Sequence, residues 1–181
     1  MITLDDAPPA IAPLADTASH AIATSPNTRT VAAPHEVLVF ELGSETYAID
    51  ILEVQEIRSS VVPTRLAGAP ASVQGLIDLR GTIVPIVDLR HLLALPKGND
   101  GASATVIMNL QGWVVGIVVD AVAEVLRPDP ARLRPAPVFD ASIDTAYVAG
   151  LLTTDDDASA RLLILVDVAR LLRDIRADIA A

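Results

Sequence analysis

Apolar residues along this chain fall into short runs separated by glycine, proline or polar pairs. Short runs rich in Val and Ile are typical of β-strands rather than of helices. The clearest case is a predicted hairpin, in which strands at 74–79 and 82–87 flank an Arg80-Gly81 pair. Glycine adopts positive φ without steric cost, so this pair predicts a tight turn. Pro85 lacks an amide hydrogen, so we expect the second strand to lie at an edge or to pair on one side there.

Two aspartates follow apolar runs and are predicted to cap helices. Asp88 precedes LRHLLAL, which predicts a short helix, and Asp167 precedes an amphipathic pattern that predicts one helix over 168–179. Further strands are predicted at 36–42, 46–50, 105–110, 113–120, 121–127, 147–152 and 161–166. Between them we expect an extended or briefly helical segment at 51–58 and proline-bearing loops at 61–70 and 128–137.

The first 34 residues differ from the rest of the chain. They are rich in Ala, Pro, Thr, Ser and Asp and show no sustained period, so we expect a disordered tail over 1–34. One folded domain is then predicted over 35–178.

That domain contains an internal repeat of about 36–95 over about 104–178. VFELGSETYAIDILEVQEI aligns without a gap with IMNLQGWVVGIVVDAVAEV, and IVDLRHLL aligns with LVDVARLL. Each half reads as five strands and an Asp-capped helix, which predicts an all-β fold of two five-stranded barrels sharing an aliphatic core. Whether strands are exchanged between the barrels is left open by the pattern.

Composition excludes several classes of function. The net charge of −10 argues against nucleic acid or an anionic membrane surface as main partner, because both require basic patches. The chain has no cysteine, which removes disulfides, thiol nucleophiles and thiolate metal sites. No apolar run is long enough to span a membrane, so we expect a soluble, cytoplasmic protein without direct membrane insertion.

Little catalytic chemistry is visible. No Ser-His-Asp elbow or glycine-rich phosphate loop is present, and the acids at 155–157 lack calcium-loop spacing, so we expect a solvated turn there. The charged pair of interest is Glu56 and Arg80, which would meet if the strand bearing Glu56 pairs beside the hairpin. Val54 is expected on the same strand face as Glu56, with Ile57 on the other. A solvated Glu56 and a core Val54 are the plain alternatives.

Five segments together resemble the CheW family of bacterial chemotaxis coupling proteins: LVFELGSETYAIDILEVQEIR, GLIDLRGTIVPIVDLR, VVGIVVDAVAEVL, RPAP and LLILVDVARLL. They span about residues 36–172 in the family's order. Asp78 departs from the family, which usually carries Asn there, and so does the long N-terminal segment. The resemblance implies two SH3-like five-stranded barrels and a non-enzymatic adaptor that needs no cofactor or metal.

The resemblance also implies partners and surfaces. It implies binding to the cytoplasmic tip of chemoreceptors, through an apolar groove between the barrels, and to the regulatory domain of the histidine kinase CheA beneath membrane receptor arrays. The family's receptor-binding positions fall on Val54, Glu56, Gly75, Arg80, Val122 and Val125. Its kinase-binding positions fall on Arg134 and Phe139, and on Ile83.

Three other readings remain open. An enzyme would need clustered titratable groups, which the sequence does not offer. A CheW-like adaptor of a non-flagellar pathway, controlling surface motility or a second messenger through its own kinase, fits equally well. A free regulatory fragment of a CheA-like kinase is the third, although the chain carries no kinase or phosphotransfer segment.

Overall fold

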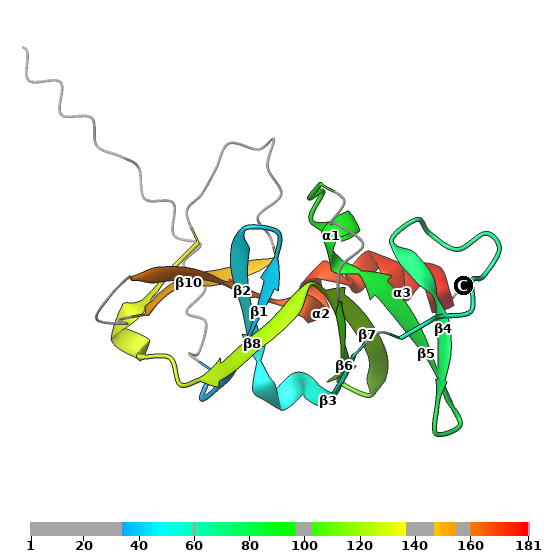
Figure 1. The fold of residues 1–181 in the computed structure, drawn as a ribbon, viewed down its shortest axis with the longest axis horizontal. Coiled ribbons are helices and arrows are strands. Elements are labelled where there is room, and N and C mark those ends of the chain that lie inside the picture. The colour runs from blue at the N-terminus through cyan, green and yellow to red at the C-terminus, as the bar shows by residue number, and fades with distance from the viewer. Residues whose placement is uncertain (1–33, 60, 97–102, 137–146, 155–159, 181) are drawn as a thin grey trace, which may run out of the picture.

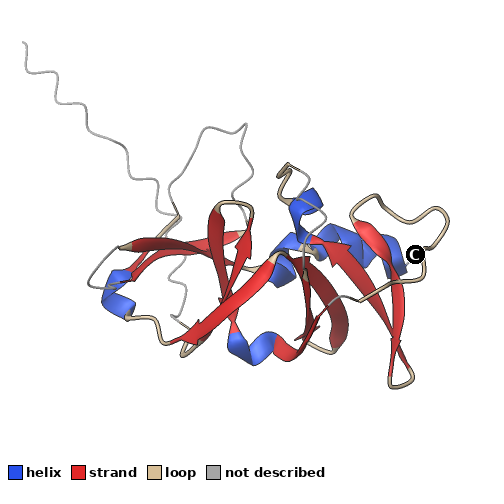
Figure 2. Ribbon diagram, in the orientation of Figure 1, coloured by secondary structure: helices blue, strands red, loops and turns tan. Residues whose placement is uncertain are grey.

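A computed structural model describes residues 34–59, 61–96, 103–136, 147–154 and 160–180 of the chain. Two curled β-sheets lie side by side, with short helices packed at their junction (Figures 1 and 2). The fold is therefore mostly β with short helices, as predicted, and it fits two SH3-like barrels. We call the sheet that contains the strands of residues 37–50 barrel A, and the sheet that contains those of residues 54–59 and 73–88 barrel B.

The first half of the repeat supplies β1 (Val37–Leu42), β2 (Glu45–Asp50), η1 (Ile51–Glu53), β3 (Val54–Ser59), β4 (Val73–Leu79), β5 (Thr82–Asp88) and α1 (Leu89–Leu92). The second half supplies β6 (Ala104–Leu110), β7 (Trp113–Val119), β8 (Ala121–Leu126), η2 (Pro130–Arg132), β9 (Leu133–Arg134), β10 (Val148–Thr154), β11 (Arg161–Val166), α2 (Val168–Leu171) and α3 (Arg173–Ala180). Each predicted strand is found within a few residues of its expected bounds.

Strands are exchanged between the two halves. The β1–β2 hairpin of the first half lies in barrel A, between β8 and β11 of the second half. The β6–β7 hairpin of the second half lies in barrel B, between β3 and β5 of the first. Barrel A, of strand order β8-β1-β2-β11-β10-β9, therefore combines the hairpin of the first half with four strands of the second. Barrel B, of order β3-β6-β7-β5-β4, combines the hairpin of the second half with three strands of the first, so neither half contains a complete barrel.

Three apolar clusters fill the molecule, and the largest is shared by the barrels, as predicted. It includes Leu38, Phe40 and Ile49 from barrel A and Val106, Met108 and Ile117 from barrel B. The interior of barrel A holds a smaller cluster around Val39 and Leu163, and that of barrel B one of Val84, Ile86 and Ile107. Removal of this apolar surface from water binds the barrels into one unit.

The Arg80-Gly81 turn forms as predicted, with φ of 53° at Arg80 and 85° at Gly81. Pro85 pairs with Leu76 of β4, whereas the parallel register of β5 with β7 begins at Ile86. Pro85 is therefore paired on one side only, as its missing amide requires.

Asp88 caps α1 as predicted, because its carboxylate accepts hydrogen bonds from the backbone N–H of Arg90 and of His91. The single helix predicted over 168–179 is wrong, since it is divided into α2 and α3 at Leu172. Leu172 has φ −92° and ψ 7°, and Leu93, its equivalent after α1, has φ −85° and ψ 7°. The four-residue helix thus ends in the same way in both halves.

The break turns α3 so that Ile175 reaches the shared core. Arg176 then lies over the ring of Trp113, 5.7 Å from its centroid, in a cation–π contact.

The loop predicted at 128–137 contains η2 and β9, which the sequence reading missed. The expected tail over 1–34, apart from Pro34, and the acidic turn at 155–157 lie outside the described residues.

Candidate functional site

The outermost strand of barrel B, β3, carries a bulge that decides which way its side chains face. Val54 lies opposite Met108, whereas Glu56 lies opposite Ile107, so Gln55 is an extra residue in the ladder. Residues directly opposite one another project from the same face of a sheet. Val54 accordingly packs against the shared core, and Glu56 faces the mouth of barrel B. The prediction that Val54 and Glu56 share a face is therefore wrong, because the bulge reverses the alternation.

The outer strand β8 of barrel A repeats this arrangement. Val122 lies opposite Phe40, whose ring belongs to the shared core, and Glu124 lies opposite Val39 of the barrel interior. Val125 then lies opposite Leu38 and returns to the face of Val122.

The two bulges together place apolar side chains of both edge strands on the face toward the other barrel. Val54 and Val122 are half-buried against the shared core, while Ile57 and Val125 are 46% and 51% exposed. We call these four residues, Val54, Ile57, Val122 and Val125, the inter-barrel stripe. All four side chains are aliphatic, two of them packed against the core and two exposed, and an exposed apolar surface of this kind suits the apolar face of a helix.

Glu56 and Arg80 lie apart from this stripe, at the mouth of barrel B. Arg80 Nη2 lies 3.5 Å from Glu56 Oε2, and Arg58 Nε lies 3.1 Å from Glu56 Oε1. The two residues meet as considered from the sequence, although β3 pairs with β6 and not with the hairpin. The Arg80 side chain is 82% exposed, so the pair contributes little stability and leaves the guanidinium accessible.

A hollow of about 410 Å³ lies at this mouth, lined by Gln55, Glu56, Leu79, Arg80, Thr82 and Val114. Asp78 faces the turn, where its carboxylate accepts a 2.6 Å hydrogen bond from the Gly81 amide. Asp78, where the family usually carries Asn, thus stabilises the turn that presents Arg80.

Barrel A has an equivalent mouth that the sequence reading did not single out. Arg161 Nη2 donates a 2.7 Å hydrogen bond to Glu124 Oε1, beside a hollow of about 380 Å³. Leu162, at the repeat position of Ile83, is 57% exposed, against 61% for Ile83. The alignment of IVDLRHLL with LVDVARLL, extended three residues back, would have identified it.

The remaining expected site residues are scattered. Gly75 is buried, and a Cβ there would lie 2.3 Å from the Thr64 carbonyl oxygen, so this position offers a partner no side chain. Arg134 is exposed on β9, near the far end of barrel A. Phe139 lies outside the described residues. Partner binding by all of these positions stays a prediction.

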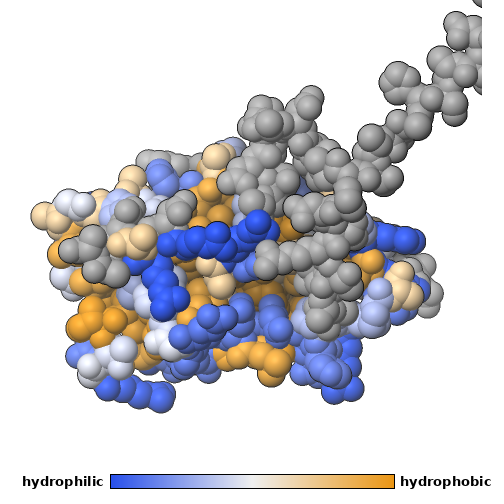
Figure 3. Space-filling model, turned by 180° about the vertical axis from the view of Figure 1, so that it is seen from behind, coloured by the Kyte–Doolittle hydropathy of each residue, from blue (hydrophilic) through white to orange (hydrophobic). Residues whose placement is uncertain are grey.

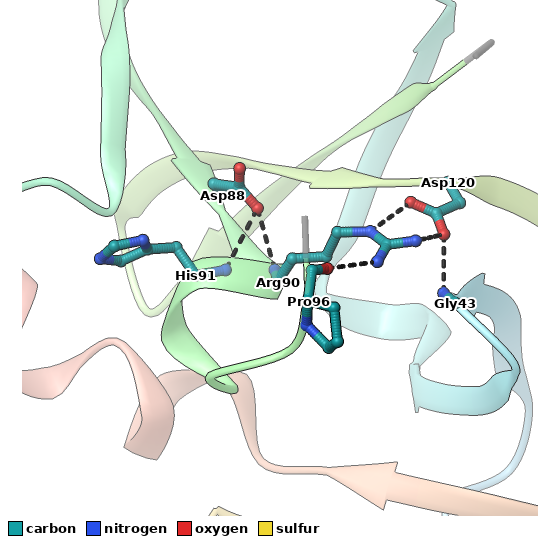
Figure 4. A network of polar contacts seen from close by, with 6 residues as sticks. All are labelled: Gly43, Asp88, Arg90, His91, Pro96 and Asp120. Atoms are coloured by element: carbon teal, nitrogen blue, oxygen red, sulfur yellow. Dashed lines mark hydrogen bonds and ion pairs between the residues drawn. The ribbon is translucent and has the colours of Figure 1, made fainter. Parts of the chain in front are cut away.

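A polar network joins the barrels on the side of α1 (Figure 4). Arg90 of α1 donates from Nε to Asp120 Oδ1 at 2.7 Å and from Nη2 to Asp120 Oδ2. Arg90 Nη1 also donates to the Pro96 carbonyl oxygen at 2.8 Å, and the Gly43 amide donates to Asp120 Oδ2 at 2.7 Å. The hydrogen bond from Arg90 holds the pKa of the Asp120 carboxyl below its usual value, while burial opposes it.

A hollow of about 510 Å³ lies between η1 and the C-terminal helices, and its charges are arranged differently. Glu53 lies at its wall with Asp50 and Asp167. Burial, and then repulsion from these two carboxylates, raises the pKa of Glu53. Arg170, Arg173 and Arg176 also line this hollow.

The large aliphatic side chains that reach the surface include Leu52, Val62 and Leu66, and the face seen in Figure 3 shows orange areas bordered by blue ones. Within the described ranges, none of the helices has the length and apolar character needed to cross a membrane.

Comparison with known proteins places the fold in a family. A model described as the CheW-like domain matches residues 36–176. The chemotaxis protein CheW of Klebsiella aerogenes is 44% identical over 138 residues, covering 76% of this chain and 81% of the relative. Protein FrzA of Myxococcus xanthus is 24% identical over 143 residues, covering 78% and 87%.

A solved structure agrees with these relatives. The crystal structure of the scaffolding protein TtCheW from Thermoanaerobacter tengcongensis matches with a TM-score of 0.66 and 34% identity. The match covers 74% of this chain and 89% of that one. With the family model spanning both barrels and their shared core, this chain belongs to the CheW-like family.

Proposed function

We propose that this protein is a chemotaxis adaptor that couples chemoreceptors to a CheA-type histidine kinase and has no catalytic activity of its own. The observation that carries the proposal is its membership of a family whose similar members are named chemotaxis protein CheW and scaffolding protein. An adaptor needs separate surfaces for two partners, and the molecule offers surfaces of different chemistry on separate elements.

The inter-barrel stripe is the proposed receptor surface. Val54 and Val122 anchor it on the shared core, and Ile57 and Val125 extend it outward. An apolar surface of this kind suits the apolar face of an amphipathic helix, which is the form we expect for a receptor tip. Arg80 and Glu56, at the mouth of barrel B, would add a charged contact beyond the stripe and would favour one register of the partner.

The proposed kinase surface lies on the outer parts of the barrels. Ile83 is an exposed aliphatic side chain close to the β4–β5 turn, and Arg134 is an exposed cation on β9. Phe139 would complete this set as an aromatic anchor. The adaptor would then stand beneath membrane receptor arrays through its partners.

The test is a titration of the purified chain with a receptor tip and, separately, with the kinase regulatory domain. Val125→Arg and Arg80→Ala are each expected to weaken receptor binding by about tenfold or more. Ile83→Arg and Phe139→Ala are expected to weaken kinase binding to the same extent. Leu162→Arg is the matched control, because Leu162 is as exposed as Ile83 and has no assigned role. Folded variants that bind both partners like the parent would refute the assigned surfaces, and a parent that binds neither would refute the adaptor role.

A second candidate is an adaptor of a non-flagellar chemosensory pathway. The similarity to protein FrzA of Myxococcus xanthus favours keeping it, because the family includes a protein under a different name. Capture of the native kinase by the tagged chain separates the two candidates, since each pathway has its own kinase.

A further inference from the structure

The chain passes between the barrels at two places that are equivalent in the repeat. One passage runs from β2 through η1 to β3, and the other runs from β7 through Asp120 to β8. In the gapless alignment of the halves, Asp120 falls on Leu52, which is 81% exposed in η1. The two passages therefore carry opposite chemistry at the same position.

At the second passage, the Asp120 carboxylate is held from both sides. Arg90 belongs to α1, which follows β5 of barrel B, and Gly43 lies in the β1–β2 turn of barrel A. The guanidinium binds both carboxylate oxygens, a planar two-point contact that fixes orientation as well as distance. The Asp120 amide also donates to the Glu41 carbonyl oxygen at 3.0 Å.

Among the residues that the structure describes, no such link is found at the first passage. Position 169, which aligns with Arg90, is Ala, and the carboxylate of Asp50 caps η1 through the Leu52 amide at 2.9 Å. The other ion pairs described either stay within one barrel, as Glu124 with Arg161 and Glu56 with Arg80 do, or lie within a single loop or strand end. Arg90 with Asp120 is thus the ion pair, among the described residues, that ties α1 of barrel B to the passage into barrel A.

We propose that Arg90 and Asp120, with the Gly43 amide, are positioning residues that fix the orientation of barrel A relative to barrel B. Asp120 directly precedes β8, which carries Val122 and Val125, and Arg90 follows β5, which carries Ile83. The link therefore sets the geometry between the surface proposed for the receptor and one proposed for the kinase. This second consequence rests on the proposed function, whereas the orientation itself does not.

The orientation is measured by the distance between spin labels on the two barrels. The chain has no cysteine, so Thr82→Cys and Ala160→Cys give one exposed label site on each barrel, at the hairpin ends. The parent is expected to give one narrow distance distribution. Asp120→Asn and Arg90→Gln are expected to broaden it, and Arg90→Lys, which keeps the charge but loses the two-point contact, to broaden it in part.

Glu124→Gln is the matched control, because it removes a charged partner of similar exposure within barrel A alone. Circular dichroism confirms that each variant is folded. An unchanged distribution in folded Asp120→Asn and Arg90→Gln would overturn the proposal, and so would equal broadening in Glu124→Gln.

The link to function is tested with the same variants. Binding of the receptor tip is expected to fall by about fivefold or more, the size of a typical coupling, because the inter-barrel stripe takes side chains from both barrels. Capture of the receptor tip by the preformed adaptor–kinase complex is expected to fall at least as much, because it also depends on the geometry between the two surfaces. Unchanged binding and capture in folded Asp120→Asn and Arg90→Gln, with broadened label distances, would refute the link to function, and losses of the same size in Glu124→Gln would refute the positioning role. A parent that binds neither partner would refute the proposed function. The label distances would still test whether Arg90 and Asp120 fix the orientation of the barrels.

Discussion

The two passages between the barrels share a backbone position and differ in their electrostatics. At the passage through η1, burial and two nearby carboxylates raise the pKa of Glu53. At the passage before β8, Arg90 lowers the pKa of Asp120. At neutral pH the charge of Glu53 thus destabilises the first passage, whereas the charge of Asp120 stabilises the second. The difference teaches that the repeat preserves the order of the strands and the place of the crossing, while the local backbone and the side chains there have diverged.

The largest expected effect tests how much of the stability of the protein depends on the apolar core that the two barrels share. Phe40→Ala removes a fully buried ring from the shared core and is expected to cost about 3–5 kcal/mol of unfolding free energy. Ile86→Ala, in the small interior of barrel B, is expected to fall at the lower end of about 2–5 kcal/mol. Urea denaturation measures both. A larger loss for Ile86→Ala would mean that the barrel interiors, rather than their interface, dominate stability.

The next effect compares Gly75 and Gly150, which align in the repeat as Gly-Leu-Ile with Gly-Leu-Leu and over which another backbone segment passes closely. A Cβ at Gly75, where φ is 152°, would meet the Thr64 carbonyl oxygen at 2.3 Å. At Gly150 it would meet the Arg134 carbonyl oxygen at 2.9 Å. We expect Gly75→Ala to cost about 2–3 kcal/mol and Gly150→Ala about half of that, by urea denaturation. Equal costs would show that barrel B relaxes around the added methyl group as readily as barrel A.

A third prediction separates the two passages by pH. The lowered pKa of Asp120 means that its contribution is complete above the unfolded value, near 4, and is lost as pH falls through the folded value. Asp120→Asn is expected to cost about 1–3 kcal/mol at pH 7 and progressively less toward pH 3. A constant loss between pH 7 and pH 3, in urea midpoints, would contradict the assigned cause.

Glu53 should behave in the opposite sense. Because its folded pKa is raised, the folded state binds a proton before the unfolded state does, so this group adds stability as pH falls toward the unfolded value. Glu53→Gln is expected to raise stability slightly at pH 7 and to lose that advantage in mild acid. Thermal melts at pH 7 and pH 4.5 are the measurement, and a destabilised variant at pH 7 would show that Glu53 has a favourable partner.

The smallest effect concerns the ion pairs at the two barrel mouths. Glu56→Gln and Glu124→Gln are each expected to change the unfolding free energy by less than about 1 kcal/mol, because their arginine partners are substantially exposed. Raising the salt concentration should reduce both effects further. A loss above that size in only one variant would show that the two mouths are not equivalent.

Much of the fold was predictable from local patterns. Apolar runs predicted the strands, Asp88 and Asp167 predicted the helices that follow them, and Arg80-Gly81 predicted the turn. The candidate surfaces were only partly predictable. The resemblance named Val54, Glu56 and Arg80, but the bulge at Gln55 separates Val54 from Glu56, and simple alternation does not foresee an inserted residue. Leu162 and Arg161 were missed although the repeat register contained them.

The sequence by itself determined the two-fold repeat, the strand content and the capped helices, because these depend on contacts between residues close in the chain. Only the tertiary structure decided that the β1–β2 and β6–β7 hairpins exchange barrels, since the exchanged and unexchanged arrangements bury the same strand faces. It likewise decided that Arg90 meets Asp120, thirty positions away, with the Gly43 amide beside them. Pairings at such separation depend on how the barrels pack, and no local pattern encodes that packing.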